Sequence, residues 1–123
     1  MSEMNGKKTA GFRLYTRQLS VDVHSSMGVI LPSAPWRLVW ALGQLVGADG
    51  KSLLEGYRAE DLCVTGVKTG YNGIGGKTVV PKEAEARLDV VIPDGKTAED
   101  VRKDIREAFD RGGFADVEIK ELD

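Results

Sequence analysis

The stretch that decides the fold is residues 84–109, which read AEARLDVVIPDGKTAEDVRKDIREAF. Partial alternation of apolar and polar residues over 84–92 predicts a strand that ends at Pro93-Asp94-Gly95. Thr97 can cap a following helix with an acidic first turn, and Gly112-Gly113 ends that helix. The apolar residues of the helix recur at i, i+4, i+7 and i+8: Val101, Ile105, Ala108 and Phe109. This spacing predicts an amphipathic helix that packs on one side.

The remaining elements extend this pattern in both directions. Alternation over residues 12–23, shifted by one position near Arg17, predicts a long strand with a bulge. Ser33-Ala34-Pro35 predicts the start of a helix that runs to about Val46. Two further strands are expected, over residues 62–67 and 114–122. The order predicts an α+β, ferredoxin-like βαββαβ sandwich, a four-stranded antiparallel sheet with two helices on one face.

Length and composition indicate one globular domain. The chain has 123 residues, of which 41% are hydrophobic and 29% charged, an ordinary balance for a folded domain. We expect residues 1–10 to be a flexible segment and residues 11–123 to form a single domain. The net charge of −2 disfavours nucleic acid as a partner, and no apolar run has the length of a membrane span. The single cysteine forms no internal disulfide and suggests a cytoplasmic location.

The first expected helix is apolar almost all round, with Arg37 and Gln44 as its only polar residues. A sheet in the same domain covers only one side of such a helix. Either the helix is fully buried in its own domain, or a second subunit or domain covers the outer side. We expect a symmetric homodimer built from this helix and an adjacent edge strand. The residues assigned to its interface are Trp36, Val39, Trp40 and Leu42.

Few residues of the chain carry reactive groups. His24, the only histidine, is either an exposed polar residue or a hydrogen-bond donor to a developing oxyanion. Cys63 lies in an expected strand and is predicted to be buried and inert. The glycine-rich stretch 70–78 fails the phosphate-loop pattern, because Tyr71 stands where that pattern requires glycine. One histidine and one cysteine do not supply the about four ligands of a zinc ion, so we expect no metal site or cofactor in this chain.

Three motifs occur in a recognisable order: VDVHSS at 21–26, PWRLVWAL at 35–42 and GYNGIGGKTVVP at 70–81. With them, residues 11–122 resemble the lid, or dimerisation, domain of a zinc metallopeptidase family. That family includes carnosinase, aminoacylase, acetylornithine deacetylase and glutamate carboxypeptidase. The resemblance implies the ferredoxin-like fold. It also implies a parent enzyme in which the lid is inserted into a catalytic domain that holds two zinc ions.

The resemblance also implies roles for particular residues. His24 would reach the partner subunit's active site and help to bind the substrate carbonyl or its tetrahedral successor. Substrate contacts would fall on Thr78, Asn72 and Gly73. Carnosinase-like members carry an arginine about a dozen residues after that threonine, whereas Val91 is the nearest match here, so the charged clamp for a substrate carboxylate is missing or displaced. The implied function is the dimerisation domain of a zinc-dependent exopeptidase or amidohydrolase, of carboxypeptidase or dipeptidase type. Its substrate would be a peptide or acyl-amino acid, and this chain alone would be inactive.

Two other functions compete with this one. A free-standing ferredoxin-like module that binds a small molecule or regulates another protein would bind its ligand tightly as the isolated chain. An RNA-binding domain would need exposed aromatic residues on its sheet in basic surroundings. Phe12 and Tyr15 fall on opposite faces of the expected strand, and the net charge is negative, so the sequence disfavours RNA.

Overall fold

The computed structural model describes residues 2–4, 7–17, 23–24, 34–69, 79–80 and 83–122. Its main sheet is antiparallel and follows the order β4-β6-β2-β7. These strands are β2 (Lys7–Arg17), β4 (Leu62–Thr69), β6 (Glu83–Val91) and β7 (Glu118–Leu122). A short β1 (Ser2–Met4) also pairs with the start of β2. Separately, β3 (Val23–His24) pairs with β5 (Val79–Val80). The expected ferredoxin-like order is confirmed.

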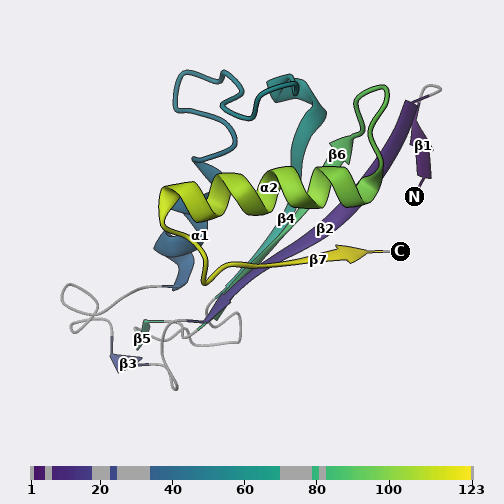
Figure 1. The fold of residues 1–123 in the computed structure, drawn as a ribbon. Coiled ribbons are helices and arrows are strands. Elements are labelled where there is room, and N and C mark those ends of the chain that lie inside the picture. Colours follow the sequence, from purple (N-terminus) through teal and green to yellow (C-terminus); the bar gives the residue numbers. More distant parts are fainter. Residues whose placement is uncertain are drawn as a thin grey trace.

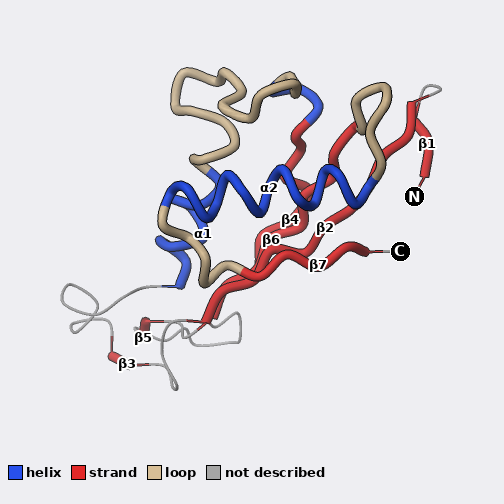
Figure 2. The backbone as a smooth tube through the Cα atoms, in the orientation of Figure 1, coloured by secondary structure: helices blue, strands red, loops and turns tan. Residues whose placement is uncertain are grey.

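Two helices cover one face of this sheet. They are α1 (Ala34–Leu42) and α2 (Ala98–Gly112), and a 3-10 turn, η2 (Ala59–Asp61), precedes β4. Figure 1 shows the two helices on the same side of the strands, and Figure 2 shows the long loop between α1 and β4 passing above them. The other sheet face has no helix among the described elements. The structure is therefore a two-layer α+β sandwich.

The core lies between the helices and the inner face of the sheet. Alternate residues of the two central strands are buried there: Ala10, Phe12, Leu14, Thr16, Ala84, Ala86, Leu88 and Val90. The expected stripe of α2 packs onto them, with Val101, Ile105 and Phe109 fully buried. The period of two in the strands and the helical spacing in α2 both place their apolar residues at this one interface.

The ends of α2 agree with the sequence signals. Thr97 Oγ1 accepts a hydrogen bond from the Asp100 N–H at 3.2 Å, and the Asp100 carboxylate accepts one from the Thr97 N–H at 3.0 Å. This capping box satisfies backbone donors that a helix leaves unpaired at its start. At the other end, Gly113 takes the left-handed conformation with φ of +88°. Phe114 N–H then donates to the Phe109 carbonyl at 2.7 Å, which closes the helix.

Several expected boundaries are wrong. The first helix ends at Leu42 and not near Val46, because residues 43–45 continue as tight turns and Val46 bridges to Ser52. The strand β7 starts at Glu118 and not at Phe114, because Phe114 to Val117 form a hydrogen-bonded turn.

The start of the first long strand also differs from the sequence analysis. The first long strand was expected from Phe12, and β2 begins at Lys7. The bulge expected near Arg17 and Gln18 falls partly outside the described residues. The structure places an irregularity elsewhere, in β4 between Val64 and Gly66. Gly66 has no side chain to hold a strict register there.

The prediction that Cys63 is buried is also wrong, because its side chain is exposed. Cys63 pairs with Asp89, whereas its neighbour Leu62 pairs with Val90. Since successive strand residues point to opposite faces, Leu62 faces the core and Cys63 lies on the uncovered face. The sequence identifies the strand, but it does not show that β4 is an edge strand.

Candidate functional site

The outer face of α1 carries large apolar side chains that are exposed in the structure. Trp36 is 58% exposed, and Val39 and Trp40 are each 53% exposed. The inner face of the same helix carries Ala34, Leu38 and Ala41, all buried. At 100° per residue these two sets lie on opposite sides of the helix. The outer side of α1 is therefore not covered by the described part of the domain.

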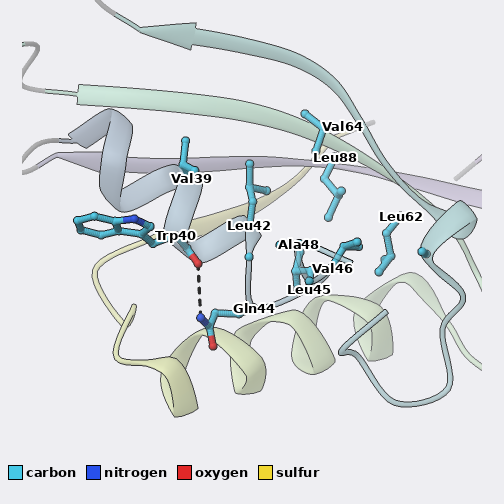
Figure 3. Close-up of a pocket in the computed structure, with 13 residues that line it drawn as sticks. Val39, Trp40, Leu42, Gln44, Leu45, Val46, Ala48, Leu62, Val64 and Leu88 are labelled. Atoms are coloured by element: carbon cyan, nitrogen blue, oxygen red, sulfur yellow. Dashed lines mark hydrogen bonds between the residues drawn. The ribbon is translucent and has the colours of Figure 1, made fainter. Parts of the chain in front are cut away.

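A groove of about 690 Å³ lies between the C-terminal end of α1, the loop that follows it and β4 (Figure 3). Val39 and Leu42 line it from the helix, and Leu62 and Val64 line it from the strand. Leu42, assigned to the interface, is half-buried and also packs against the core. Among the described lining residues Gln44 supplies the one polar amide group, and that amide N–H reaches the Trp40 carbonyl at 3.5 Å. The side chains that line the groove are therefore mostly apolar.

The strand β4 forms one edge of the described sheet, next to this groove. It pairs with β6 on one side, and no described strand pairs with its other side. Val64 and Val67 are 44% and 60% exposed. They pair with Leu88 and Ala86, so they lie on the helix-covered face of the sheet, as the groove does. An unpaired edge beside exposed apolar side chains is a surface suited to association.

The uncovered face of the sheet has a different character. Tyr15 donates a hydrogen bond to Glu83 at 2.5 Å, and Arg13 pairs with Glu85. The hydrogen bond to Glu83 is the main cause that raises the pKa of Tyr15 above its usual value. Arg87 pairs with Asp89 at 3.2 Å. Arg13 and Arg87 on this face are thus each paired with a carboxylate, which repels a nucleic-acid backbone, and Phe12 is buried on the opposite face.

A polar cluster lies where α1 meets the connection between α2 and β7. Arg37, the only charged residue of α1, pairs there with Asp116, which also accepts a hydrogen bond from Thr16. Partial burial raises the pKa of the Asp116 carboxyl, but the hydrogen bonds from Arg37 and Thr16 outweigh burial and leave that pKa below its usual value. The cluster therefore favours a charged carboxylate.

The residues that the resemblance assigns to substrate fall mostly outside the described part of the chain. Thr78, Asn72 and Gly73 all lie there. His24 is described through its backbone, which pairs in β3 with Val79 of β5. Residues 55 positions apart are thereby brought into register, and Val79 directly follows Thr78 in the sequence.

A metal site does not fit the described residues. No group of three histidine, cysteine, aspartate or glutamate side chains among them is placed to hold an ion. The single cysteine of the chain is exposed in β4, and the single histidine is His24. Zinc needs about four such ligands, and the described residues bring no such set together. The described helices include none long and apolar enough to cross a membrane.

The fold and the apolar surface define a class of protein, a two-layer α+β domain in which an exposed apolar helix face lies beside a strand edge that no described strand pairs. The sequence profile of the peptidase dimerisation domain matches residues 10–116. The chain belongs to this family, the dimerisation domains of the M20 peptidases. A search of curated proteins found no relative that matches.

Solved structures share the fold. An M20 family metallo-carboxypeptidase from Sulfolobus solfataricus is 22% identical, with a TM-score of 0.78 over 94% of this chain and 42% of its own. Human carnosine dipeptidase 1 is 16% identical, with a TM-score of 0.68 over 94% of this chain and 36% of its own. A dinuclear metal-binding M20 peptidase from Bacillus subtilis is 16% identical, with a TM-score of 0.53 over 94% and 26%. The chain thus spans less than half the length of these enzymes.

Two features of the surface escaped the sequence analysis. The groove needs the loop after α1 to close one of its walls, and the irregularity in β4 shifts the strand register beside it. The sequence signals that could have indicated these features are the apolar residues Val64 and Val67 and the glycine Gly66. They lie three or fewer residues apart, where a bulge breaks the period of two that identifies a strand.

Proposed function

We propose that this chain is the dimerisation domain of a larger metallopeptidase and that it associates with a second copy of itself. The observation that carries the proposal is the continuous apolar surface formed by Trp36, Val39 and Trp40 on α1, the groove, and the unpaired edge of β4. Exposed apolar surface of this kind marks sites of protein association. Membership of the dimerisation-domain family favours a second copy over an unrelated partner.

Two-fold symmetry suits the shape of this surface. In a symmetric dimer the same patch serves both subunits, so α1 would face α1 and β4 would face β4. Pairing of two edge strands satisfies backbone groups that an exposed edge leaves to water. The two sheets would then continue across the interface, and the outer apolar side chains of both helices would be buried together.

We further propose a catalytic domain of the same parent chain as the second partner. Ser2 lies opposite Thr9 and Leu122 lies opposite Gly11, on the same edge of β2. Two chain segments that enter and leave a domain side by side allow it to be inserted into another domain with little distortion. The length of the structural relatives, more than twice that of this chain, supports the same arrangement.

For the parent enzyme we propose a zinc-dependent exopeptidase or amidohydrolase that acts on a peptide or an acyl-amino acid. His24 would serve the active site of the partner subunit as a hydrogen-bond donor to the substrate carbonyl and to the oxyanion that forms from it. Thr78, Asn72 and Gly73 would contact the substrate. The pairing of β3 with β5 supports a shared site, because it sets His24 opposite the residue that follows Thr78.

The alternative is a free-standing module that binds a small molecule in the groove. A volume of about 690 Å³ falls within the range of ligand pockets. Such pockets also carry several polar groups that orient the ligand, whereas Gln44 is the one amide among the described lining residues. The scarcity of polar side chains in this lining favours a protein surface as the occupant.

Sedimentation equilibrium of the 123-residue chain tests the dimer. We expect a reversible monomer–dimer equilibrium, and Val39→Glu should weaken it by about tenfold or more, because a carboxylate must then be desolvated at the interface. Lys103→Glu introduces the same side chain at an exposed position of α2 and should leave the equilibrium unchanged. A wild-type chain that stays monomeric at high concentration would contradict the proposal, and saturable binding of an apolar dye such as ANS in the groove of that monomer would favour the alternative.

A further inference from the structure

Arg37 is held from several sides although it stands on an otherwise uncharged helix. Its Nη2 donates a hydrogen bond to the Gly113 carbonyl at 3.0 Å and pairs with the Asp116 carboxylate. Its Nε lies 3.4 Å from Asp116 Oδ2. The guanidinium carbon also lies 4.6 Å from the centre of the Phe114 ring. These contacts fix a side chain that usually has many rotamers.

The same carboxylate connects the helix to the central sheet. Thr16, near the end of β2, is fully buried, and its Oγ1 donates to Asp116 Oδ2 at 2.8 Å. Asp116 therefore receives one hydrogen bond from β2 and a charged partner from α1. A guanidinium and a carboxylate joined through two nitrogen atoms have a defined relative orientation. The direction in which Arg37 leaves α1 is thus set by the strand and by the connection that follows α2.

The packing of α1 on the sheet involves few large side chains. Of the three fully buried residues of this nine-residue helix, Ala34 and Ala41 have small side chains and Leu38 has a large one, and the half-buried Leu42 also packs against the core. A small methyl side chain interlocks little with the residues facing it. Arg37 lies one position, or 100°, from both Trp36 on the outer face and Leu38 on the inner face. Anchoring its side chain therefore sets the rotation of both faces relative to the sheet.

We infer that Arg37, together with Asp116 and Thr16, is a positioning element that sets the rotation of α1 about its own axis. It thereby fixes the direction in which Trp36, Val39 and Trp40 face outward. The consequence for association rests on the proposed dimer, whereas the placement of the helix does not. Arg37 acts on this apolar face only through α1, the helix that carries both Arg37 and the three apolar residues.

Amide hydrogen exchange of the full 123-residue chain tests the placement of the helix. Arg37→Leu keeps the length of the aliphatic stem and removes the charge and the donors. We expect the amides of α1 to exchange about tenfold faster relative to those of α2, a size typical of coupling within one hydrogen-bonded network. Asp116→Asn should have a similar effect, and the double variant should add little to either. Arg37→Lys should restore part of the protection, because a single ammonium replaces the charge but not the paired geometry.

Arg106 provides a matched control. It donates to the Phe114 carbonyl at 2.9 Å and to the Val117 carbonyl at 2.5 Å, so it holds the same connection from α2. Its hydrogen-bond partners among the described residues are Asp110, Phe114 and Val117, none of which belongs to α1. Arg106→Leu should loosen the connection and α2 together, because Arg106 belongs to α2, so its effect on exchange should not be selective for α1. If Arg37→Leu changes exchange equally in both helices, or if Arg106→Leu reproduces its selectivity for α1, the inference is overturned.

The dimer constants of the same variants separate this inference from the proposed function. If the wild-type chain dimerises and Arg37→Leu dimerises as tightly, the link from Arg37 to the surface is wrong. If the wild-type chain never dimerises, the proposed function fails, and selective exchange in α1 still supports the positioning role of Arg37. Weaker dimerisation of Arg37→Leu and Asp116→Asn, with Arg106→Leu unchanged, supports both.

Discussion

Trp36 and Trp40 stack on the outer face of α1, with their ring centroids 5.7 Å apart and their planes inclined by 29°. The residues are four positions apart, so the helix itself brings the rings together. The helix has no acidic residue in its first turn and no basic residue in its last, and therefore lacks the charges that commonly stabilise helix ends. At nine residues it is also shorter than isolated helices that persist in water. The stability of α1 therefore depends on the surfaces that it packs against, and a partner on its exposed outer face would add to that stability.

In the parent enzyme, His24→Ala should lower turnover strongly. Loss of one hydrogen-bond donor to an oxyanion costs about 3 kcal/mol, or roughly a hundredfold or more in kcat. Steady-state kinetics at saturating substrate measure the effect. The metal content and the dimer constant should stay unchanged, because the proposed role involves neither. Unchanged turnover would mean that His24 is an ordinary surface residue.

Thr97→Ala should destabilise the domain by about 1 kcal/mol, because it removes the side-chain acceptor for the Asp100 N–H. Urea unfolding followed by far-ultraviolet circular dichroism gives the difference in the free energy of unfolding. Thr97→Ser retains the hydroxyl and should restore most of the lost stability. Equal stability of the alanine and serine variants would show that the capping box contributes little here.

Gly113→Ala should also destabilise the domain, by about 1 kcal/mol. The cost comes from the backbone, since φ is +88° and no atom lies within 4 Å of the position that a Cβ would take. Gly113→Asn should cost less, because asparagine tolerates the left-handed conformation better than alanine. Thermal unfolding of the three proteins ranks them, and an alanine variant as stable as wild type would contradict this account of the end of α2.

The contribution of Asp116 to stability should depend on pH in a defined direction. Its pKa is lowered in the folded state, so its stabilising effect is present above the unfolded pKa, about 4, and is lost as the pH falls through the folded value. The difference in unfolding free energy between wild type and Asp116→Asn should therefore be constant near neutral pH and shrink below about pH 4. A difference that stays constant down to acid pH would show that the charge of Asp116 does not contribute.

Sequence patterns predicted most of the fold. The strand and helix within residues 84–109 appear as β6 and α2, because both have one face buried and therefore a clear period. The predicted end of the first helix was wrong, because the apolar pattern continues through Leu45 whereas the helical backbone ends at Leu42. Leu45 is buried all the same, so the pattern reported burial and not helical backbone.

The sequence predicted the apolar composition of the exposed surface on α1, but it did not predict the shape of the groove beside it. An almost wholly apolar helix indicated that one domain face could not cover it, and the exposure of Trp36, Val39 and Trp40 confirms that part of the prediction. The groove and the contacts of Arg37 could not be predicted, because they join residues from α1, β2, β4 and the α2–β7 connection. The assignments to His24 and Thr78 stay predictions.

The sequence by itself determined the order of the strands and helices, the faces that α2 and the central strands bury, and the family to which the chain belongs. Each of these depends on residues close together in the chain, where apolar spacing and turn residues act locally. Only the tertiary structure decided that β4 is an edge, that Cys63 is exposed and that Asp116 joins Thr16 to Arg37. Thr16 and Asp116 are 100 positions apart, and no local pattern of side chains specifies which distant partner a polar group meets when the sheet and its helices pack.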